Sequence, residues 1–323
     1  MKTITIQITV LLIAAWMPEI FAKDASPATS DPNKVDADYA LQGEYVGESG
    51  DKKLGLQVIA LGGGKFEAVA SKGGLPGAGW DKEKPRERIQ GELVDGKVKF
   101  VASKGHVGWL ADGKIAVKTP DGQDAGSLKR VIRKSPTLGA KAAEGAVVVF
   151  DGTSIDGWKR GKMEGKLLTQ GALSKETFGD HSIHIEFRLP YMPTARGQAR
   201  GNSGLYVQGR YEVQMLDSFG LTGKDNECGG LYKASVPSEN MCYPPLTWQT
   251  YDIDFVAAKF EAGKKIKNAN ITVKHNGVKI HDKVELSGPT PGGKLKNEEG
   301  PGPIFLQNHG NPVRYRNIWV VKK

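Results

Sequence analysis

Cysteine is nearly absent from this chain, whose 323 residues include only Cys228 and Cys242. Two cysteines exclude a disulfide-dense scaffold, and their spacing is not that of a metal site. In an exported protein the two could form one disulfide that closes a short loop. The alternative is that both are buried thiols.

Long hydrophobic runs are also scarce, and the one candidate lies at the N-terminus. There Lys2 precedes a mostly apolar stretch, residues 4–16, which is too short to span a bilayer comfortably. Ala22 is the small residue expected before a cleavage site. We therefore expect residues 1–22 to be the signal peptide of a secreted or periplasmic bacterial protein, with an uncleaved interfacial helix as the alternative. The segment has no cysteine for lipid attachment, and we expect no integral membrane segment.

Arginine-rich helices and recognised nucleic-acid signatures are missing, although the formal net charge is +9. The lysines that contribute to this charge are scattered along the chain. A basic balance could favour acidic glycans or anionic surfaces, but an ordinary solvated surface accounts for it more simply. We expect no nucleic-acid partner.

Helical periodicity is missing too, whereas short alternating strands with glycine-rich turns fill the chain. The pattern predicts a polar linker over residues 23–37 and a small all-β accessory domain over residues 38–134. A second linker is expected over residues 135–145, before a larger β-domain over residues 146–323.

The smaller domain contains two clear turn signals and one internal repeat. Asp-Gly pairs at residues 94–97 and 111–114 predict hairpins, because Asp-Gly supplies the positive φ that tight hairpin turns need. The five-residue sequence Val-Ala-Ser-Lys-Gly occurs at residues 69–73 and again at residues 101–105. We interpret the repeat as two similar hairpins stacked in a small sheet or barrel.

The larger domain shows the alternation of strands that are buried on one face. Many antiparallel strands with glycine-rich turns predict an all-β fold, a two-sheet antiparallel sandwich whose sheets pack through their apolar faces and leave a polar face to solvent. In one strand the apolar face is expected to carry Ile183, Ile185 and Phe187, and the polar face His184, Glu186 and Arg188.

One hairpin of this domain, GNSGLYVQGRYEVQMLDSFG, combines an apolar face with acids and an amide. Glu212 and Gln214 lie two residues apart on one strand, so their side chains share a face about 7 Å apart. A bulge or a strand end near residues 215–216 would bring Asp217 to the same face. Glycosidases usually cleave sugar bonds with two carboxylates that lie about 5 to 9 Å apart. The alternative is an ordinary solvated strand.

Further polar residues flank this row. Amides and arginines hydrogen-bond sugar hydroxyls, and tyrosine stacks on sugar rings. A structural histidine and arginines that pair with acids such as Asp252 or Asp254 are the alternatives. The candidates that could contact a ligand are Asn202, Tyr232, Asn308, His309, Arg314 and Arg316.

The larger domain resembles the 3-keto-disaccharide hydrolase family. Its opening, FDGTSIDGW at residues 150–158, is similar to the start of that family, and GNSGLYVQGRYEVQMLDSFG, KDNECGGLY, PPLTWQTYDIDF, HNGVKIHDKVEL and LQNHGNPVRYRNIWV resemble later blocks in order. Ile155 stands where leucine is usual, and residues 193–200 lengthen the loop before Asn202. The smaller domain is outside the resemblance, and we expect it to be an accessory glycan-binding or packing module.

The resemblance implies a concanavalin A-like jelly-roll sandwich and an exported enzyme that acts on glycosides oxidised to a ketone at C3. A sugar 3-dehydrogenase would be a functional partner that supplies such a substrate. The C3 ketone acidifies the proton on C2, so a base can start β-elimination of the C1 substituent, after which water adds. Direct hydrolysis is the alternative reaction.

We therefore predict a 3-keto-glycoside hydrolase or lyase with Glu212 and Asp217 as the acid/base pair and His309 as a substitute for either. Acids and amides on one face could ligate a divalent cation, although no spacing demands one. A lectin-like binding module and an envelope structural protein are the competing functions. The residues expected to hold substrate are Asn202, Gln214, Tyr232, Asn308, Arg314 and Arg316.

Overall fold

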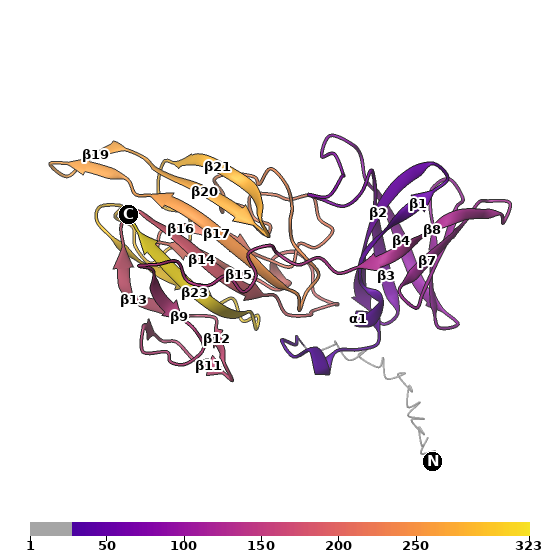
Figure 1. The fold of residues 1–323 in the computed structure, drawn as a ribbon, viewed down its shortest axis with the longest axis horizontal. Helices are drawn as coiled ribbons and strands as arrows, with labels where there is room; N and C mark the ends of the chain where they lie inside the picture. The colour runs from indigo at the N-terminus through magenta and orange to yellow at the C-terminus, as the bar shows by residue number, and fades with distance from the viewer. Residues whose placement is uncertain (1–27) are drawn as a thin grey trace, which may run out of the picture.

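The structure, a computed structural model, describes residues 28–323 and contains two β-rich bodies that lie side by side (Figure 1). The expected signal peptide and the start of the first linker lie outside these residues. The helical elements are the short turns η1 (Pro32–Lys34), α1 (Asp38–Leu41) and η2 (Gly197–Ala199). Within the described residues, no helix is long and apolar enough to cross a membrane.

Eight strands of the N-terminal body close into an antiparallel barrel. Each strand pairs with the next along the chain, and the last pairs with the first to complete the ring. Large side chains such as Tyr45, Phe66 and Leu128 are buried in this body. The strands are β1 (Gly43–Ser49), β2 (Lys52–Gly62), β3 (Lys65–Lys72), β4 (Glu87–Val94), β5 (Lys97–Val101), β6 (Val107–Ala111), β7 (Lys114–Lys118) and β8 (Asp124–Val131).

The two Asp-Gly turns lie where the sequence predicts them, between β4 and β5 and between β6 and β7. Asp95 and Asp112 both have φ 48°, and the glycine after each also has a positive φ. Two consecutive positive φ values are the geometry that matches the twist of a tight hairpin. The prediction of these hairpins is confirmed.

Helix α1 lies at the end of the barrel that contains the β2–β3 turn. The backbone N–H of Gly64 in that turn donates to the Asp38 carboxylate at 2.9 Å. The Tyr45 hydroxyl donates to the Leu41 carbonyl at 2.7 Å, and Tyr39 packs against the barrel core. One end of the barrel is therefore covered by the helix.

The C-terminal body is a sandwich of two antiparallel sheets, as predicted for this all-β chain. The five-stranded sheet has the order β10 (Trp158–Lys159), β13 (Leu173–Phe178), β22 (Gly302–Leu306), β15 (Ser203–Val207) and β16 (Tyr211–Met215). The eight-stranded sheet has the order β11 (Met163–Glu164), β12 (Leu167–Thr169), β23 (Arg314–Lys322), β14 (His181–Arg188), β17 (Trp248–Val256), β20 (Ala269–His275) and β21 (Val278–Leu286), with β9 (Val147–Phe150) also paired to β23. Strands β18 (Lys259–Glu261) and β19 (Lys264–Lys267) form a separate hairpin.

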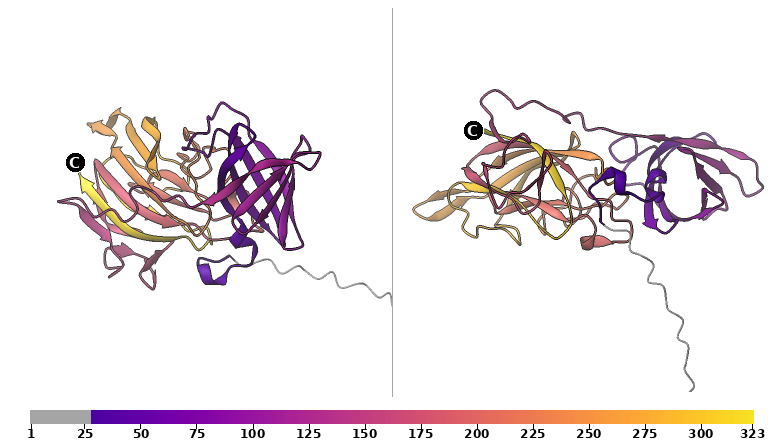
Figure 2. Two further views of the ribbon diagram at one scale, coloured as in Figure 1. Left: turned by 45° about the vertical axis from the view of Figure 1, so that its right-hand side comes forward. Right: turned by 90° about the horizontal axis from the view of Figure 1, so that it is seen from below.

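The predicted alternation in β14 is confirmed on its apolar side, because Ile183, Ile185 and Phe187 all belong to the sandwich core. The other side is not open to solvent as expected, since His184 and Glu186 are each 1% exposed. Residues 135–145, the linker from the barrel, run along this face (Figure 2). The linker therefore buries a face that the sequence alone places in water.

Barrel and sandwich pack directly on each other. Ile59 and Val69, on the outer side of β2 and β3, belong to the sandwich core. A Cβ atom on Gly220 would lie 2.5 Å from the Ile59 side chain, so the loop after β16 fits tightly against the barrel. Arg86 and Arg88 donate to the carbonyls of that loop at 2.8 and 3.1 Å. The barrel thus holds the loop that follows the acid-bearing strand.

Candidate active site

The β15–β16 hairpin forms as the sequence predicts, with residues 208–210 as its three-residue connection; Gln208 and Gly209 in this turn have φ values of 51° and 62°. In its register Tyr206 lies opposite Glu212, and Gly204 lies opposite Gln214. The apolar side chains belong to the core: Leu205, Val207, Val213 and Met215. The polar set therefore occupies the outer face of the five-stranded sheet.

This outer face is not the exposed row that the sequence suggests. Glu212 is 2% exposed, Gln214 1% and Asp217 4%. The reason is that two segments, distant in sequence, lie against the hairpin. They are residues 229–232 at the edge of β16 and residues 288–300, which we call the covering segment.

The edge of β16 is closed by backbone hydrogen bonds to residues 229–232. The Gln214 N–H donates to the Gly230 carbonyl at 2.9 Å, and the Tyr232 N–H donates to the Glu212 carbonyl at 3.1 Å. Tyr232 is half-buried here, close enough to Tyr206 to influence its ionisation. The predicted contact residue Tyr232 is therefore part of this site.

The covering segment is fixed to the hairpin at several points. The Glu212 N–H donates to the Thr290 hydroxyl at 2.9 Å, and the Tyr206 hydroxyl donates to the Pro291 carbonyl at 2.7 Å. A Cβ atom on Gly292 would lie 2.5 Å from the Tyr206 hydroxyl oxygen. Only a residue without a side chain fits there, so the segment closes directly over Tyr206.

The Glu212 carboxylate lies over Gly204, where a Cβ atom would approach Oε1 to 2.0 Å. Its Oε2 lies 2.6 Å from the Tyr206 hydroxyl oxygen, so the single hydroxyl proton is shared between Glu212 and the Pro291 carbonyl. Burial raises the pKa of Glu212 to about 7, because the single hydroxyl donor, which acts in the opposite direction, does not offset the lost water. Glu212 can therefore both take and give a proton near neutral pH.

Tyr206 connects Glu212 to a more exposed side chain. Its hydroxyl also accepts from the Gln307 amide at 3.2 Å. Burial raises the pKa of Tyr206, and the neighbouring Glu212 raises it further, so the phenol stays protonated. Gln307 is half-buried, and its Oε1 has no hydrogen-bond partner within the described residues.

An open cleft of about 740 Å³ lies on the same outer face. The strand register places one row of neighbouring residues across all five strands, from Glu212 to the residues that line the cleft. The row is Glu212, Tyr206, Phe305, Leu173 and Lys159. Leu173 and Phe305 line the cleft, and the Tyr206 ring lies 5.4 Å from the Phe305 ring. The cleft therefore begins one strand away from the Glu212–Tyr206 pair.

The cleft is basic, and part of its wall comes from the covering segment. The ammonium group of Lys294 lies 4.4 Å from the centre of the Phe305 ring. Lys159, Arg160 and Asn308 also line it. An aromatic floor with amide and cationic groups around it suits a sugar ring with an electron-rich oxygen.

Comparison with known proteins identifies the family of the larger domain. Residues 145–321, more than half of the chain, match the family described as the 3-keto-alpha-glucoside-1,2-lyase-like domain. The chain belongs to this family. The resemblance inferred from the sequence is thus confirmed, and residues 145–321 are called the lyase-like domain below.

A solved structure from Parabacteroides distasonis, described as a "putative glycosyl hydrolase", is 33% identical and has a TM-score of 0.52; the match covers 56% of this chain and 86% of that one. Two further structures with the same description and organism are 18% identical, with TM-scores of 0.40 and 0.39. They cover 56% and 55% of this chain and 94% and 99% of their own. No curated protein matches the chain.

Two predicted contact residues of the lyase-like domain, Asn202 and Gln214, lie together beside Glu212. The Asn202 amide donates to the Gln198 carbonyl at 2.8 Å, and the Gln214 amide donates to the Gln198 side chain at 3.3 Å. Gln198 belongs to the lengthened loop, residues 193–200, so that loop contacts the row. The Oδ1 of Asn202 is buried without a hydrogen-bond partner among residues 28–323.

Asp217 is not brought together with Glu212. Strand β16 ends at Met215, and the Asp217 carboxylate accepts from Arg200 Nε at 2.6 Å. In the described part of the chain, no hydrogen bond or ion pair joins the two acids. Arg200 is itself buried beside the barrel, with the Ala60 carbonyl at 3.5 Å. Asp217 is therefore the counter-ion of a buried arginine at the domain interface.

Arg314 and Arg316 lie on the outer face of the other sheet. Tyr315 between them points inward, where its hydroxyl meets the Ser203 hydroxyl. Arg314 pairs with Glu164, and Arg316 pairs with Glu186. The structure thus places both arginines away from Glu212, paired with acids other than the Asp252 and Asp254 considered from the sequence.

Asn308 and His309 follow β22 in an exposed loop. Asn308 lines the cleft and accepts from the Gly310 N–H at 2.8 Å. His309 has no hydrogen bond or ion pair among the described residues. The loop is joined to the residue that precedes β15, because the side chain of Asn311 accepts from the Asn202 N–H at 2.7 Å.

Cys228 and Cys242 are two buried free cysteines, the second of the alternatives left by the sequence. The Cys228 sulfur lies 3.2 Å from the Tyr251 hydroxyl. Across residues 28–323, no group of three or more His, Cys, Asp or Glu side chains is placed to hold a metal ion.

Sequence reasoning missed Tyr206, Thr290 and Gln307. Tyr206 carries a local signal, because it alternates with Gly204 on the face opposite the apolar residues and lies opposite Glu212 in a tight hairpin. Gln307 stands beside Asn308 in a segment already singled out. Thr290 has no such signal, since it approaches Glu212 from 78 positions away.

Proposed function

We propose that this chain is an exported glycoside-cleaving enzyme whose substrates are glycosides oxidised to a ketone at C3. Family membership and the description of the 33%-identical relative support a glycosidase-type enzyme. The observation that carries the proposal is the buried Glu212, with a pKa of about 7, joined to Tyr206 beside an open cleft. A binding module has no need of a carboxylate balanced between its two protonation states.

The proposed reaction begins with proton transfer from C2 of the sugar. Glu212 takes this proton, and the electron pair of the C2–H bond forms an enolate with the C3 ketone. As the enolate collapses, the C3 carbonyl reforms, a C1=C2 double bond forms, and the C1–O bond breaks. The leaving oxygen takes up a proton, and water then adds across C1=C2 to give the free 3-keto sugar.

The chain's own residues suit these steps. The amide of Gln307 and the hydroxyl of Tyr206 are donors that can stabilise the enolate oxygen. Phe305 gives an apolar floor to the sugar ring, and Asn308 can hold a hydroxyl. In this proposal Tyr206, rather than Asp217, is the second proton-carrying group, because Asp217 is engaged by Arg200.

Access to the pair requires the covering segment to move. Glu212 and Tyr206 are buried beneath Pro291 and Gly292, so substrate reaches them only when that part of the segment shifts. The same shift would carry Lys294, which lies over the Phe305 ring in this structure, away from that end of the cleft. Closure after binding would exclude water from the enolate.

The test uses the purified mature protein with a 3-keto-glucoside and with its unoxidised parent, each with and without a chelator. We expect aglycone release from the keto compound alone, and the chelator arm decides whether a divalent cation takes part. Release from both compounds at similar rates would identify an ordinary glycosidase. Calorimetric binding without release from either compound would identify a lectin-like module.

Export and substrate supply are separate parts of the proposal. Export predicts that the mature protein in the periplasm or medium begins near Lys23, which N-terminal sequencing measures. A substrate with a C3 ketone must come from oxidation of a C3 hydroxyl, so a sugar 3-dehydrogenase is the proposed functional partner.

A further inference from the structure

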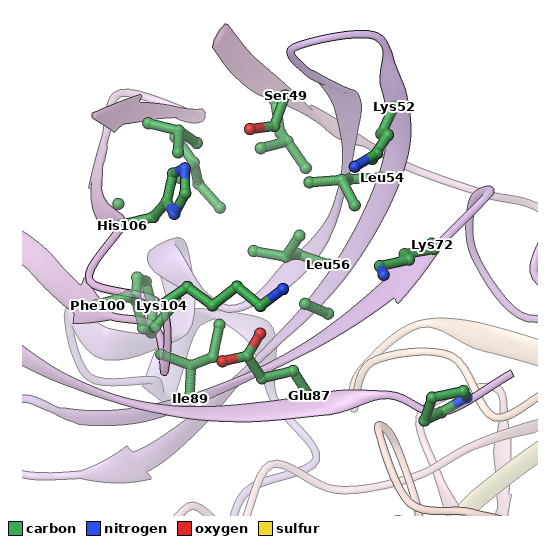
Figure 3. A pocket seen from close by; sticks show the side chains of 17 residues that line it. Ser49, Lys52, Leu54, Leu56, Lys72, Glu87, Ile89, Phe100, Lys104 and His106 are labelled. Carbon is green, nitrogen blue, oxygen red and sulfur yellow. The ribbon is translucent and has the colours of Figure 1, made fainter. Parts of the chain in front are cut away.

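The barrel contains a cavity of about 340 Å³ that lies outside the lyase-like domain (Figure 3). It lies toward the end opposite helix α1, at the start of β2 and β4 and the end of β3 and β5. A volume of this size is at the lower end of the range for small-molecule sites. The cavity is therefore large enough for a compact ligand and is closed at the far end by the barrel core.

The inner wall of the cavity is apolar. Ile115 and Leu128 are 1% and 0% exposed, and Phe100 is 3% exposed. Leu56 and Ile89 complete the wall. These side chains offer no hydrogen bonds, so the inner part of a ligand must be hydrocarbon or aromatic rather than a sugar.

The mouth of the cavity is positively charged. Lys52, Lys72 and Lys104, which we call the lysine rim, all line it, and their side chains lie around the opening (Figure 3). None of the three forms an ion pair within the described residues. His106 also lines the mouth.

Of the residues that the structure describes, one acid, Glu87, lines the mouth. Its carboxylate accepts from the Ser103 backbone N–H at 2.7 Å. This hydrogen bond holds the pKa of Glu87 below its usual range, so the group is ionised. Three lysines and one carboxylate leave two positive charges at the mouth uncompensated.

Both copies of the five-residue sequence repeat contribute residues to the lining of this cavity. In the first copy of Val-Ala-Ser-Lys-Gly, Ala70 and Lys72 line the cavity; in the second, Ala102 and Lys104 do. Each copy places a small residue on the wall and a lysine at the mouth. The repeat therefore supplies both the space and the charge of one cavity.

We propose that the barrel binds a small amphipathic carboxylate, with its hydrocarbon part inside the barrel and its carboxylate at the lysine rim. An apolar pocket with a cationic mouth selects such a molecule over a neutral or cationic one of the same length, because only the anion gains from the uncompensated lysines. This function is independent of the activity proposed for the lyase-like domain.

The test is calorimetric titration of the full mature chain with octanoate, octan-1-ol and octylamine. We expect saturable octanoate binding and weaker binding of the other two. Reversing two rim charges in Lys72→Glu/Lys104→Glu is expected to weaken octanoate binding by about tenfold or more. The matched control is Lys97→Glu/Lys114→Glu, two exposed lysines at the opposite end of the same barrel, which should bind octanoate like the wild type.

A second variant tests the interior. Ala102→Trp places an indole in the cavity and should abolish octanoate binding while the thermal unfolding midpoint of the barrel stays close to that of the wild type. The proposal is overturned if octanol binds as tightly as octanoate, if the rim variant binds like its control, or if no titration saturates at millimolar ligand.

Discussion

Two buried glutamates on opposite outer faces of the sandwich behave in opposite ways. Glu212, on the five-stranded sheet, is 2% exposed, and Glu186, on the eight-stranded sheet, is 1% exposed. Burial by itself would raise the pKa of both carboxyl groups. For Glu212 the result is a pKa of about 7; for Glu186, hydrogen bonds outweigh burial and the pKa falls to about 2.

The difference comes from the number of donors. The Glu186 carboxylate accepts from Asn317 at 2.9 Å, from the Gly139 N–H at 2.6 Å and from Arg316 at 2.6 Å, with His184 nearby. The Glu212 carboxylate accepts only from Tyr206 among the described residues. Two carboxylates of similar solvent exposure therefore differ: Glu186 stays ionised at neutral pH, whereas the charge of Glu212 can change there.

The covering elements differ in the same way. Over Glu186, the linker donates the Gly139 N–H directly to the carboxylate. The Asn317 amide donates both to Glu186 and to the Ala140 carbonyl of the linker. Over Glu212, the covering segment accepts from the backbone and from Tyr206 and gives the carboxylate no donor. The first arrangement binds the linker to the sheet, whereas the second leaves Glu212 available for proton transfer.

The largest expected effect is on catalysis at Glu212. Glu212→Gln keeps the shape but removes the titrating group, so kcat on a 3-keto-glucoside should fall by about 100-fold or more. The measurement is aglycone release at saturating substrate, with thermal unfolding as the check on folding. Unchanged turnover in a folded variant would end the assignment of Glu212 as the base.

The matching change on the other face should affect stability instead. Glu186→Gln removes the anion that the nearby donors favour, and a pKa lowered from 4.5 to about 2 corresponds to about 3 kcal/mol. The free energy of unfolding at pH 7, measured with urea, should fall by about that amount. Activity per folded molecule should stay at the wild-type level, and a large loss of kcat would break the comparison.

The two acids should also give opposite pH dependences of stability. Glu186 has a lowered pKa, so its stabilisation is complete above pH 4.5 and is lost as the pH falls toward 2. Glu212 has a raised pKa, so ionisation of the unfolded chain destabilises the fold increasingly from pH 4.5 to 7, by up to about 3 kcal/mol. Glu212→Gln should therefore gain stability relative to the wild type over that interval. The prediction is contradicted if the free energies of unfolding of Glu212→Gln and of the wild type differ by a constant amount from pH 4 to 8.

The sequence could predict which side chains share a face, because alternation in β14 and β16 is a local property of strands. It could also predict the turns at Asp95 and Asp112, where the residue pair itself requires positive φ. It could not predict that both outer faces are buried. The groups that cover them, Thr290 over Glu212 and Gly139 over Glu186, come from 78 and 47 positions away.

For the candidate site, too, the sequence predicts which side chains share a face but not which distant residues contact them. Glu212 and Gln214 lie on the face that alternation gives them, and Asn202 joins them across the hairpin. The role of Asp217 depends on Arg200, which the lengthened loop brings to it. No spacing along β16 contains that information.

Tyr206→Phe should have a smaller effect than loss of the acid. Among residues 28–323 it removes the only hydrogen bond that favours ionised Glu212, so the pKa of Glu212 should rise further and kcat/KM should fall by about tenfold near pH 7. The diagnostic is the pH–rate profile, whose acidic limb should move to higher pH. A uniform loss at every pH, with no movement of that limb, would show that Tyr206 acts only in packing.

The smallest effect is expected from Arg314→Lys. Arg314 lies on the outer face of the eight-stranded sheet and pairs with Glu164, whose side chain is 62% exposed. Arg314 itself is 8% exposed and also donates to Gln170 Oε1 at 3.2 Å, so the lysine retains the charge but loses one hydrogen bond. The free energy of unfolding should fall by about 1 kcal/mol, and kcat/KM on the 3-keto-glucoside should remain close to wild type. A raised KM would instead place substrate against this second face, and the division of the sandwich into a reactive face and an anchoring face would then fail.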